Sequence, residues 1–229
     1  MSGHSDSGIK ARVRTVRERI AAACERAGRD PAGVTLIAAS KTQGPGAVAA
    51  AWRAGIRDFG ENRVQEALAK MPLVEALTGA GLDGPRWHLI GHLQRNKAKA
   101  AAGAFVILHG VDSARLVDTL AGSGHATRIL FEVNVAGEAT KHGASPEELD
   151  ALIAHAARYP TISVEGLMTV APLATDPEDV RPVFRALRLL AEAHNLSTLS
   201  MGMTNDFEVA IEEGATHVRV GRAIFGVRA

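Results

Sequence analysis

The sequence predicts a single (β/α)₈ barrel of the TIM type, preceded by one extra helix. Short apolar segments with the character of buried strands alternate with segments of helical periodicity, which is typical of parallel sheets. The 229 residues, 46% of them hydrophobic, suit one domain of barrel size, and no linker-like stretch divides them. A doubly wound open sheet is the alternative. However, residues 41–46, which follow the first expected strand, lack the G-x-G-x-x-G pattern of that fold.

The N-terminal end is expected to contain a short lead and the extra helix. Residues 1–8 are polar and contain no apolar segment like that of a signal peptide, so we expect a disordered lead. Residues 9–229 then form the barrel domain. A helix is expected over 9–27, before Gly28, because apolar residues recur there at three- and four-residue steps: Val13, Val16, Ile20, Ala23 and Cys24.

The remaining elements are expected to alternate in order. Strands are expected over 34–40, 57–62, 87–91, 105–111, 128–135, 163–170, 198–202 and 217–221. Helices are expected over 46–54, 63–77, from about 93, then over 114–120, 147–158, 177–194 and 206–213. Capping residues mark several of these boundaries, including Gly55, Ser113 and the pair Ser145 and Pro146.

Composition restricts the possible partners and the compartment. The chain has 26 Lys and Arg against 25 Asp and Glu, so no overall charge favours nucleic acid or an acidic membrane. No apolar segment reaches the length of a membrane span. Cys24, the only cysteine, cannot form an internal disulfide, and no Cys/His cluster suggests a zinc site. We therefore expect a cytoplasmic protein without a nucleic-acid, membrane or metal partner.

A lysine follows the first strand, where a barrel places its active site. Active sites of such barrels lie at the carboxyl ends of the strands. An amine that is partly desolvated there becomes a nucleophile that can form a Schiff base with an aldehyde, which makes Lys41 the first candidate. The alternative is a lysine that simply extends into solvent. Other strand ends offer Glu61, Asn62, His88, His92, Asp112, Ser113, Asn134, Met168, Ser200 and Arg219.

The last two strands end in glycine-containing segments, 198–204 and 217–226. Glycine lets backbone N–H groups approach an anion closely, and barrels often bind phosphate after strands seven and eight. In a closed barrel strand eight lies beside strand one. A phosphate bound there and an aldehyde joined to Lys41 can therefore belong to one small ligand, and pyridoxal 5′-phosphate contains both groups.

Six motifs closely resemble the pyridoxal phosphate homeostasis protein family, which comprises single-domain relatives of the N-terminal barrel of alanine racemase. They are residues 39–42 (ASKT), 59–66 (FGENRVQE), 87–97 (WHLIGHLQRNK), 166–168 (GLM), 199–203 (LSMGM) and 218–226 (VRVGRAIFG). The resemblance runs from about Ile9 to the C-terminus. It implies pyridoxal 5′-phosphate as the cofactor. By resemblance, Lys41 matches the lysine that forms the internal aldimine, Arg219 matches the arginine that faces the pyridine nitrogen, and Asn62 lines the ring.

The resemblance also implies a phosphate site. Ser200 and the backbone around Gly221 and Arg222 match the family's phosphate cradle. Two positions differ from the pattern expected for many relatives. Arg222 stands where a threonine is common, and Thr204 stands where a serine hydroxyl is expected and can replace it. These differences affect only the individual phosphate contacts.

The same residues favour a carrier over a catalyst. An arginine cannot give up its proton to the pyridine nitrogen, so the ring would be a weak electron sink. Alanine racemases use a tyrosine supplied with a second domain as the opposing base, whereas the only tyrosine here, Tyr159, is expected to pack at a helix exit. The resemblance therefore implies a binding protein for intracellular vitamin B6 homeostasis. Such a protein would hold the cofactor, buffer it or deliver it to apo-enzymes, and would be a monomer without catalytic residues.

Other interpretations stay open at this stage. The first is a weak pyridoxal phosphate-dependent racemase or lyase, and the second is a class I aldolase that uses Lys41 on a sugar phosphate. His88 and His92 can both face the mouth of the barrel. For His88 the alternative is a side chain that points into the layer behind the mouth. The loop residues Lys141 and His142 either gate the site or belong to a mobile polar loop. A basic helix face, Arg95, Lys97 and Lys99, is expected to be solvated.

Overall fold

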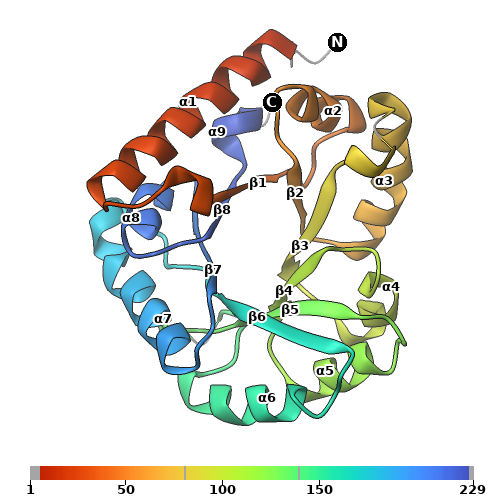
Figure 1. Ribbon diagram of the computed structural model, residues 1–229, viewed down its shortest axis with the longest axis vertical. Helices are drawn as coiled ribbons and strands as arrows, with labels where there is room; N and C mark the ends of the chain where they lie inside the picture. The colour runs from red at the N-terminus through yellow and green to blue at the C-terminus, as the bar shows by residue number, and fades with distance from the viewer. Residues whose placement is uncertain (1–5, 80, 139, 227–229) are drawn as a thin grey trace.

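The computed structural model describes residues 6–79, 81–138 and 140–226, which form a closed parallel barrel surrounded by helices (Figure 1). The strand order follows the sequence: β1 (Thr35–Ala39), β2 (Asp58–Glu61), β3 (Arg86–His92), β4 (Ile107–Val111), β5 (Thr127–Glu132), β6 (Ile162–Met168), β7 (Thr198–Met203) and β8 (His217–Val220). β8 pairs in parallel with β1, with Ile37 opposite Arg219. This closure confirms the predicted barrel and excludes the open sheet.

Helices follow the strands and form the outer ring (Figure 1). The α-helices are α1 (Asp6–Arg26), α2 (Pro45–Arg53), α3 (Val64–Thr78), α4 (Ala98–Ala101), α5 (Ala114–Ala121), α6 (Leu149–Ala156), α7 (Arg181–Ala193), α8 (Phe207–Glu212) and α9 (Arg222–Phe225). Short 3₁₀ turns are η1 (Pro31–Gly33), η2 (Gly81–Asp83), η3 (Arg95–Lys97), η4 (Pro146–Glu148) and η5 (Pro177–Val180). α1 packs against α2, α8 and α9, and therefore covers the seam between β8 and β1.

The N-terminal helix begins earlier than expected. Residues 1–5 of the expected disordered lead lie outside the described residues, but Asp6–Gly8 already belong to α1. A carboxylate in the first turn of a helix interacts favourably with the helix dipole. Asp6 supplies that carboxylate, and it also pairs with Arg53 of α2 at 2.8 Å. These contacts explain why the helix starts three residues before Ile9.

Most other boundaries differ from the expected ones by a few residues. The helix expected from about residue 93 is the short pair η3 and α4, and the helix expected over 147–158 is divided into η4 and α6. A capping box between Ser145 and Glu148 starts η4. Within the described part of the chain, no helix combines the length and hydropathy that a membrane-spanning helix requires.

The strands separate an apolar layer from a partly polar interior. Trp87 and Leu89 of β3 belong to the core cluster packed under the helices. Successive side chains of a strand point to opposite faces, so His88 between them points into the barrel. The same alternation applies to His109, Ser200 and Arg219, each of which has at least one strand neighbour in that core cluster. All four of these side chains are buried, so the barrel interior contains polar groups.

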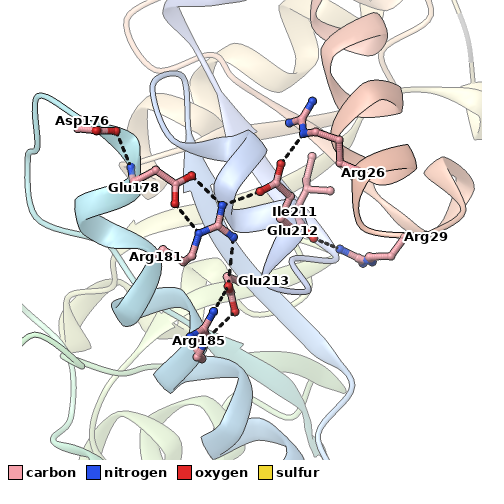
Figure 2. Close-up of polar contacts among 9 residues, drawn as sticks. All are labelled: Arg26, Arg29, Asp176, Glu178, Arg181, Arg185, Ile211, Glu212 and Glu213. Atoms are coloured by element: carbon pink, nitrogen blue, oxygen red, sulfur yellow. Dashed lines mark hydrogen bonds and ion pairs between the residues drawn. The ribbon is translucent and has the colours of Figure 1, made fainter.

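Arg181, the first residue of α7, connects three elements of the outer ring (Figure 2). Its guanidinium donates to Glu178 of η5, to Glu212 of α8 at 2.6 Å and to Glu213 at 3.1 Å. Glu212 also accepts from Arg26 of α1 at 2.7 Å. The network therefore fastens η5 and α7 to α8 and α1 on the outside of β7 and β8.

This network predicts an acid-dependent contribution to stability. The hydrogen bond from Arg181 holds the pKa of the Glu212 carboxyl below its usual 4.5. A lowered folded-state pKa means that the carboxylate stabilises the fold above pH 4.5, and that this contribution is lost as the pH falls through the folded-state pKa. Glu212→Gln should lower the free energy of unfolding by about 1 kcal/mol at neutral pH. The loss should disappear below that pKa, as measured by urea unfolding at a series of pH values.

Glu192→Gln is the matched control, because the Glu192 carboxylate pairs with Arg188 while its side chain is 57% exposed. An exposed pair of this kind contributes little. Equal losses in the two variants, or a loss in Glu212→Gln that is the same at every pH, would contradict the stabilising role of the network.

Candidate functional site

A cavity of about 800 Å³ opens at the carboxyl ends of the strands, where active sites of such barrels lie. The residues that follow β1, β2 and β8 reach it together, although they are far apart in the sequence. Five of the six residues expected to bind the cofactor line this cavity: Lys41, Asn62, Arg219, Gly221 and Arg222. The sixth, Ser200, is absent from the lining and is described below.

Lys41 lies at the rim of the cavity. It is in a turn after β1, and the next residue, Thr42, has a φ of 67° in the left-handed region. A non-glycine residue there is uncommon, so the surrounding structure must hold this turn in place. The Lys41 side chain is exposed. We expected partial desolvation, whereas the structure presents an amine that solvent and ligands can reach.

A buried ion pair holds the residue before Lys41. Ser40 is fully buried, and its hydroxyl donates to Glu61 Oε1 at 2.7 Å. Lys70 of α3 donates to the same oxygen at 2.7 Å and to the Ser40 carbonyl at 3.0 Å. Both the side chain and the backbone of Ser40 are therefore fixed. We did not predict Lys70, although the buried Ala67 and Val74, three residues before and four residues after it, mark its helix face as the inner one.

Asn62 reaches the cavity because Gly91 leaves room for it. A Cβ placed on Gly91 would lie 2.6 Å from the Asn62 carbonyl oxygen. Any side chain at position 91 would therefore push the segment after β2 away. Both residues line the cavity, so the glycine in the expected motif allows the ends of β2 and β3 to approach each other.

Arg219 of β8 is a buried cation that lines the cavity. Its Nη1 donates to the carbonyl and the hydroxyl of Ser200, both at 2.7 Å, and its Nη2 donates to the Thr169 carbonyl at 2.8 Å. Burial lowers the pKa of Arg219 to about 10, although Glu132 and Asp206 oppose this shift. The guanidinium therefore stays charged at neutral pH. The groups that accept its hydrogen bonds, from Ser200 and Thr169, are uncharged.

One end of the cavity contains hydroxyl, guanidinium and backbone donors. A Cβ on Gly221 would lie 3.3 Å from the Ala39 carbonyl oxygen, so β8 approaches the end of β1 closely there. The Gly221 N–H donates to Thr204 Oγ1 at 3.4 Å, and Arg222 Nη2 donates to Asn205 Oδ1 at 3.3 Å. All four of these residues after β7 and β8 line the cavity. This donor set is suited to an anion.

Ser200 lies deeper than the sequence suggested. It is fully buried in the barrel interior, where its hydroxyl accepts from Arg219 and is hydrogen-bonded to His109 Nδ1 at 2.8 Å. Its position does not fit the expected direct contact with a phosphate. β7 is irregular after this point, because Gly202 has a φ of 90° and the pairing with β8 shifts register between Ser200 and Met203. Thr204, just after β7, lines the cavity and offers a hydroxyl instead.

Two carboxyl groups of the lining were not predicted. Glu132 is buried at the end of β5, and burial raises its pKa although Arg219 opposes the shift. Among the described residues its Oε2 has no hydrogen-bond partner. Burial also raises the pKa of Asp206, whose Oδ1 accepts from the Met203 N–H. The sequence did contain one signal for Glu132, because it is a single acidic residue within an apolar strand.

Asn134, which was expected at a strand end, does not line the cavity. It hydrogen-bonds to Glu138 within its loop.

His92 and His142 form a stacked pair at the wall of the cavity. Their ring centroids are 4.0 Å apart with an angle of 12° between the planes, and Asp112 Oδ2 lies 3.2 Å from His92 Nδ1. An ion bound at about 2.0–2.1 Å from a ring nitrogen must lie near the plane of that ring. Two nearly parallel rings this far apart cannot share one ion. In this arrangement His92 and His142 therefore line the cavity as a stacked pair and are not two ligands of one metal ion.

The remaining candidates lie elsewhere. His88 points into the barrel interior, as one of the two interpretations expected. Lys141 donates to the Val170 carbonyl next to the cavity. The Tyr159 hydroxyl donates to Asp118 of α5 at 2.7 Å and does not line the cavity. Arg95 and Lys99 are exposed on η3 and α4.

Comparisons with known proteins agree with this geometry. The family model "Alanine racemase, N-terminal domain" matches residues 12–229. The pyridoxal phosphate homeostasis protein of Aquifex aeolicus is 45% identical over 227 residues, which cover 95% of this chain and 97% of the relative. A protein of unknown function from Bifidobacterium adolescentis has a similar structure, with 34% identity and a TM-score of 0.90. That match covers 98% of this chain and 97% of the other.

A third similar structure contains a ligand. It is PipY of Synechococcus elongatus, solved with PLP bound, which is 33% identical with a TM-score of 0.80. The match covers 95% of this chain and 100% of PipY. In that relative the fold therefore accommodates pyridoxal phosphate.

The ion pair behind Lys41 leads to a prediction about stability. Lys70→Met should lower the free energy of unfolding by about 3–5 kcal/mol, because it leaves the Glu61 carboxylate buried without its cation. The double variant Glu61→Gln, Lys70→Met should recover most of this loss, and urea unfolding measures both. Lys99→Met, at an exposed position of α4, is the control and should change little. If the double variant were no more stable than the single one, the buried charge would not be the cause.

Proposed function

Because the chain belongs to the pyridoxal phosphate homeostasis protein family and matches the alanine racemase N-terminal domain, we propose that it binds pyridoxal 5′-phosphate in the cavity at the strand ends. In this proposal it buffers the cofactor or delivers it to other proteins within vitamin B6 homeostasis. The observation on which the proposal depends is that an accessible amine, a buried guanidinium and an anion-binding end line one cavity: Lys41, Arg219, Thr204, Gly221 and Arg222.

The cavity fits this cofactor in size and in chemistry. Its volume of about 800 Å³ lies within the range of small-molecule sites. β1 and β8 are neighbours, so Lys41 and Gly221 come from adjacent strand ends, and the Gly221 Cα region lies against Ala39. A molecule with an aldehyde and a phosphate on one small ring can therefore meet both groups at once.

Each proposed residue has a separate role. When bound, the cofactor supplies an aldehyde carbon that is bonded to the lysine nitrogen with loss of water. Lys41 Nζ would form that bond through its lone pair, and its exposure leaves it open to a ligand. Asn62 lines the ring from the end of β2. Arg219 donates to the ring nitrogen and retains its own proton, so the nitrogen stays neutral and the ring withdraws electrons weakly.

At the anion-binding end, the backbone at Gly221 and Arg222 and the hydroxyl of Thr204 surround the phosphate. The guanidinium of Arg222 adds a positive charge to this end. Ser200 lies in the barrel interior, where it accepts a hydrogen bond from Arg219, and it is not a phosphate ligand in this proposal. The site residues proposed from the sequence are thus retained except for this change in the role of Ser200.

We propose a carrier without strong catalysis of its own. Arg219 disfavours carbanion chemistry, and Tyr159 hydrogen-bonds to Asp118 away from the cavity. The alternative, a weak racemase or lyase, is favoured by three titratable side chains in the lining: His92, His142 and Glu132. Chiral chromatography of alanine and serine incubated with the loaded protein separates these functions, because a carrier gives no turnover. Apo-enzyme partners, a monomeric state and a cytoplasmic location stay predictions from the sequence.

The covalent attachment is tested with Lys41→Ala. Wild-type protein incubated with pyridoxal 5′-phosphate, reduced with borohydride and digested should carry the cofactor mass on the peptide that contains Lys41. Lys41→Ala should lose both this adduct and the visible absorbance band of the bound cofactor. Lys141→Ala is the matched control, because Lys141 lies near the same cavity but donates to the Val170 carbonyl. An adduct spread over many lysines, or retained in Lys41→Ala, would reject the proposed anchor.

The anion-binding end is tested by comparing two ligands. Thr204→Val removes one hydroxyl, so it should raise the Kd for pyridoxal 5′-phosphate about tenfold, since a hydrogen bond to a charged group is lost. The Kd for pyridoxal, which lacks the phosphate, should stay within about twofold. Fluorescence titration of both ligands measures these values. An equal change for both ligands, or no change for either, would show that Thr204 does not contact the phosphate.

A further inference from the structure

A chain of hydrogen bonds crosses the barrel interior behind Arg219. His88 Nε2 lies 3.0 Å from Asp58 Oδ1, and His88 Nδ1 lies 3.0 Å from His109 Nε2. His109 Nδ1 lies 2.8 Å from Ser200 Oγ, which accepts from Arg219 Nη1 at 2.7 Å. Each of these residues is less than a tenth exposed. The chain thus connects β2, β3, β4, β7 and β8 without a gap.

Only one assignment of protons satisfies every bond in this chain while both imidazoles are neutral. Asp58 is a carboxylate that only accepts, so His88 must donate from Nε2 and accept at Nδ1. His109 must then donate from Nε2 to His88 and accept at Nδ1. The Ser200 hydroxyl therefore donates to His109, which leaves its lone pairs for Arg219. All the donors point from Arg219 toward Asp58.

The surroundings keep the chain in this state. Burial lowers the pKa of His109 well below 6.5, and the positive charge of Arg219 lowers it further. Burial raises the pKa of Asp58, but hydrogen bonds from His88 and Arg86 outweigh this effect and lower it overall. His217 faces both histidines at 6.2 Å between ring centroids, and burial lowers its pKa to about 4. At neutral pH, Asp58 is therefore a carboxylate, and the imidazoles of His109 and His217 are neutral.

The direction of the chain matters for the bonds behind Arg219. If His109 carried its proton on Nδ1, it would donate to Ser200, and the hydroxyl oxygen would accept from both His109 and Arg219. The hydroxyl hydrogen would then have no acceptor among the members of the chain, and neither His109 Nε2 nor His88 Nδ1 would carry a proton for the bond between them. The fixed direction prevents this, because the distant Asp58 carboxylate sets the tautomer of both histidines and so directs the Ser200 hydroxyl hydrogen at His109.

We propose that Asp58, His88, His109 and Ser200 are positioning residues that fix the Arg219 guanidinium against the ring nitrogen of the cofactor. This inference rests on the proposed function, because the ring nitrogen belongs to bound pyridoxal 5′-phosphate. The four side chains do not touch the cofactor. They act through Arg219, whose constant position keeps the ring nitrogen unprotonated.

The first test needs no cofactor. Long-range ¹H–¹⁵N correlation spectra of ligand-free wild-type protein near neutral pH should show His88 and His109 as neutral rings that are protonated on Nε2. A ring protonated on Nδ1, or charged at that pH, would overturn the proposed direction of the chain. This result stands whether or not the protein binds the cofactor.

The second test measures the effect on the ring. In wild-type protein loaded with pyridoxal 5′-phosphate that is ¹⁵N-labelled in the ring, the nitrogen shift should be that of an unprotonated pyridine. Ser200→Ala removes the link to Arg219, and the pH at which the ring nitrogen becomes protonated should rise by about one unit, a tenfold gain in proton affinity. His217→Gln is the matched control. It alters a partly buried histidine beside the chain, one that is hydrogen-bonded to Thr216 and not to the chain.

The outcomes separate the two proposals. A midpoint that is the same in Ser200→Ala and in His217→Gln would overturn the positioning role while leaving cofactor binding intact. A wild-type protein that takes up no cofactor would instead reject the proposed function, and with it any role of the chain toward a ring, while the ligand-free spectra would still establish the chain itself.

Discussion

The pairing of β8 with β1 is the constraint on which the site depends. It closes the barrel and sets Ile37 opposite Arg219. Residues at the two ends of the domain thereby become neighbours, so that the turn containing Lys41 and the segment after Gly221 border one cavity. Parallel strands place their carboxyl ends at the same edge, which is why a barrel collects groups from many loops there. α1 packs over this seam together with α8 and α9, so the extra helix supports the closure.

The sequence predicted the fold and five residues that line the cavity, because both follow from local patterns. Alternating apolar segments indicate a barrel, and a residue that directly follows a strand must lie near its carboxyl end. Lys41, Asn62 and Arg222 were found in this way. Ser200 lies deeper than the resemblance implied: the positive φ of Gly202 within β7 separates it from Thr204, whose residue lines the cavity. Local pattern alone does not reveal a backbone angle.

Contacts between residues far apart in the sequence could not be predicted, for a different reason. The ion pair of Glu61 with Lys70 and the bond between His109 and Ser200 depend on how strands and helices meet in space. A weaker signal was present in the strands. His88 stands between Trp87 and Leu89, and a polar residue flanked by two outward apolar ones must face the interior. Burying such a group is costly unless it is hydrogen-bonded, so its presence implies partners inside the barrel.

The interior chain also constrains how the protein can change. His88, His109 and Ser200 each accept from one neighbour and donate to the next, so replacing one of them leaves an unmatched donor or acceptor on both sides. A single exchange at His88 or His109 is therefore costly, whereas a coordinated exchange of adjacent members can restore every bond. Substitutions in this part of the barrel should therefore occur together at adjacent members of the hydrogen-bonded chain. The polar interior would be inherited as one unit, while the apolar layer around it varies residue by residue.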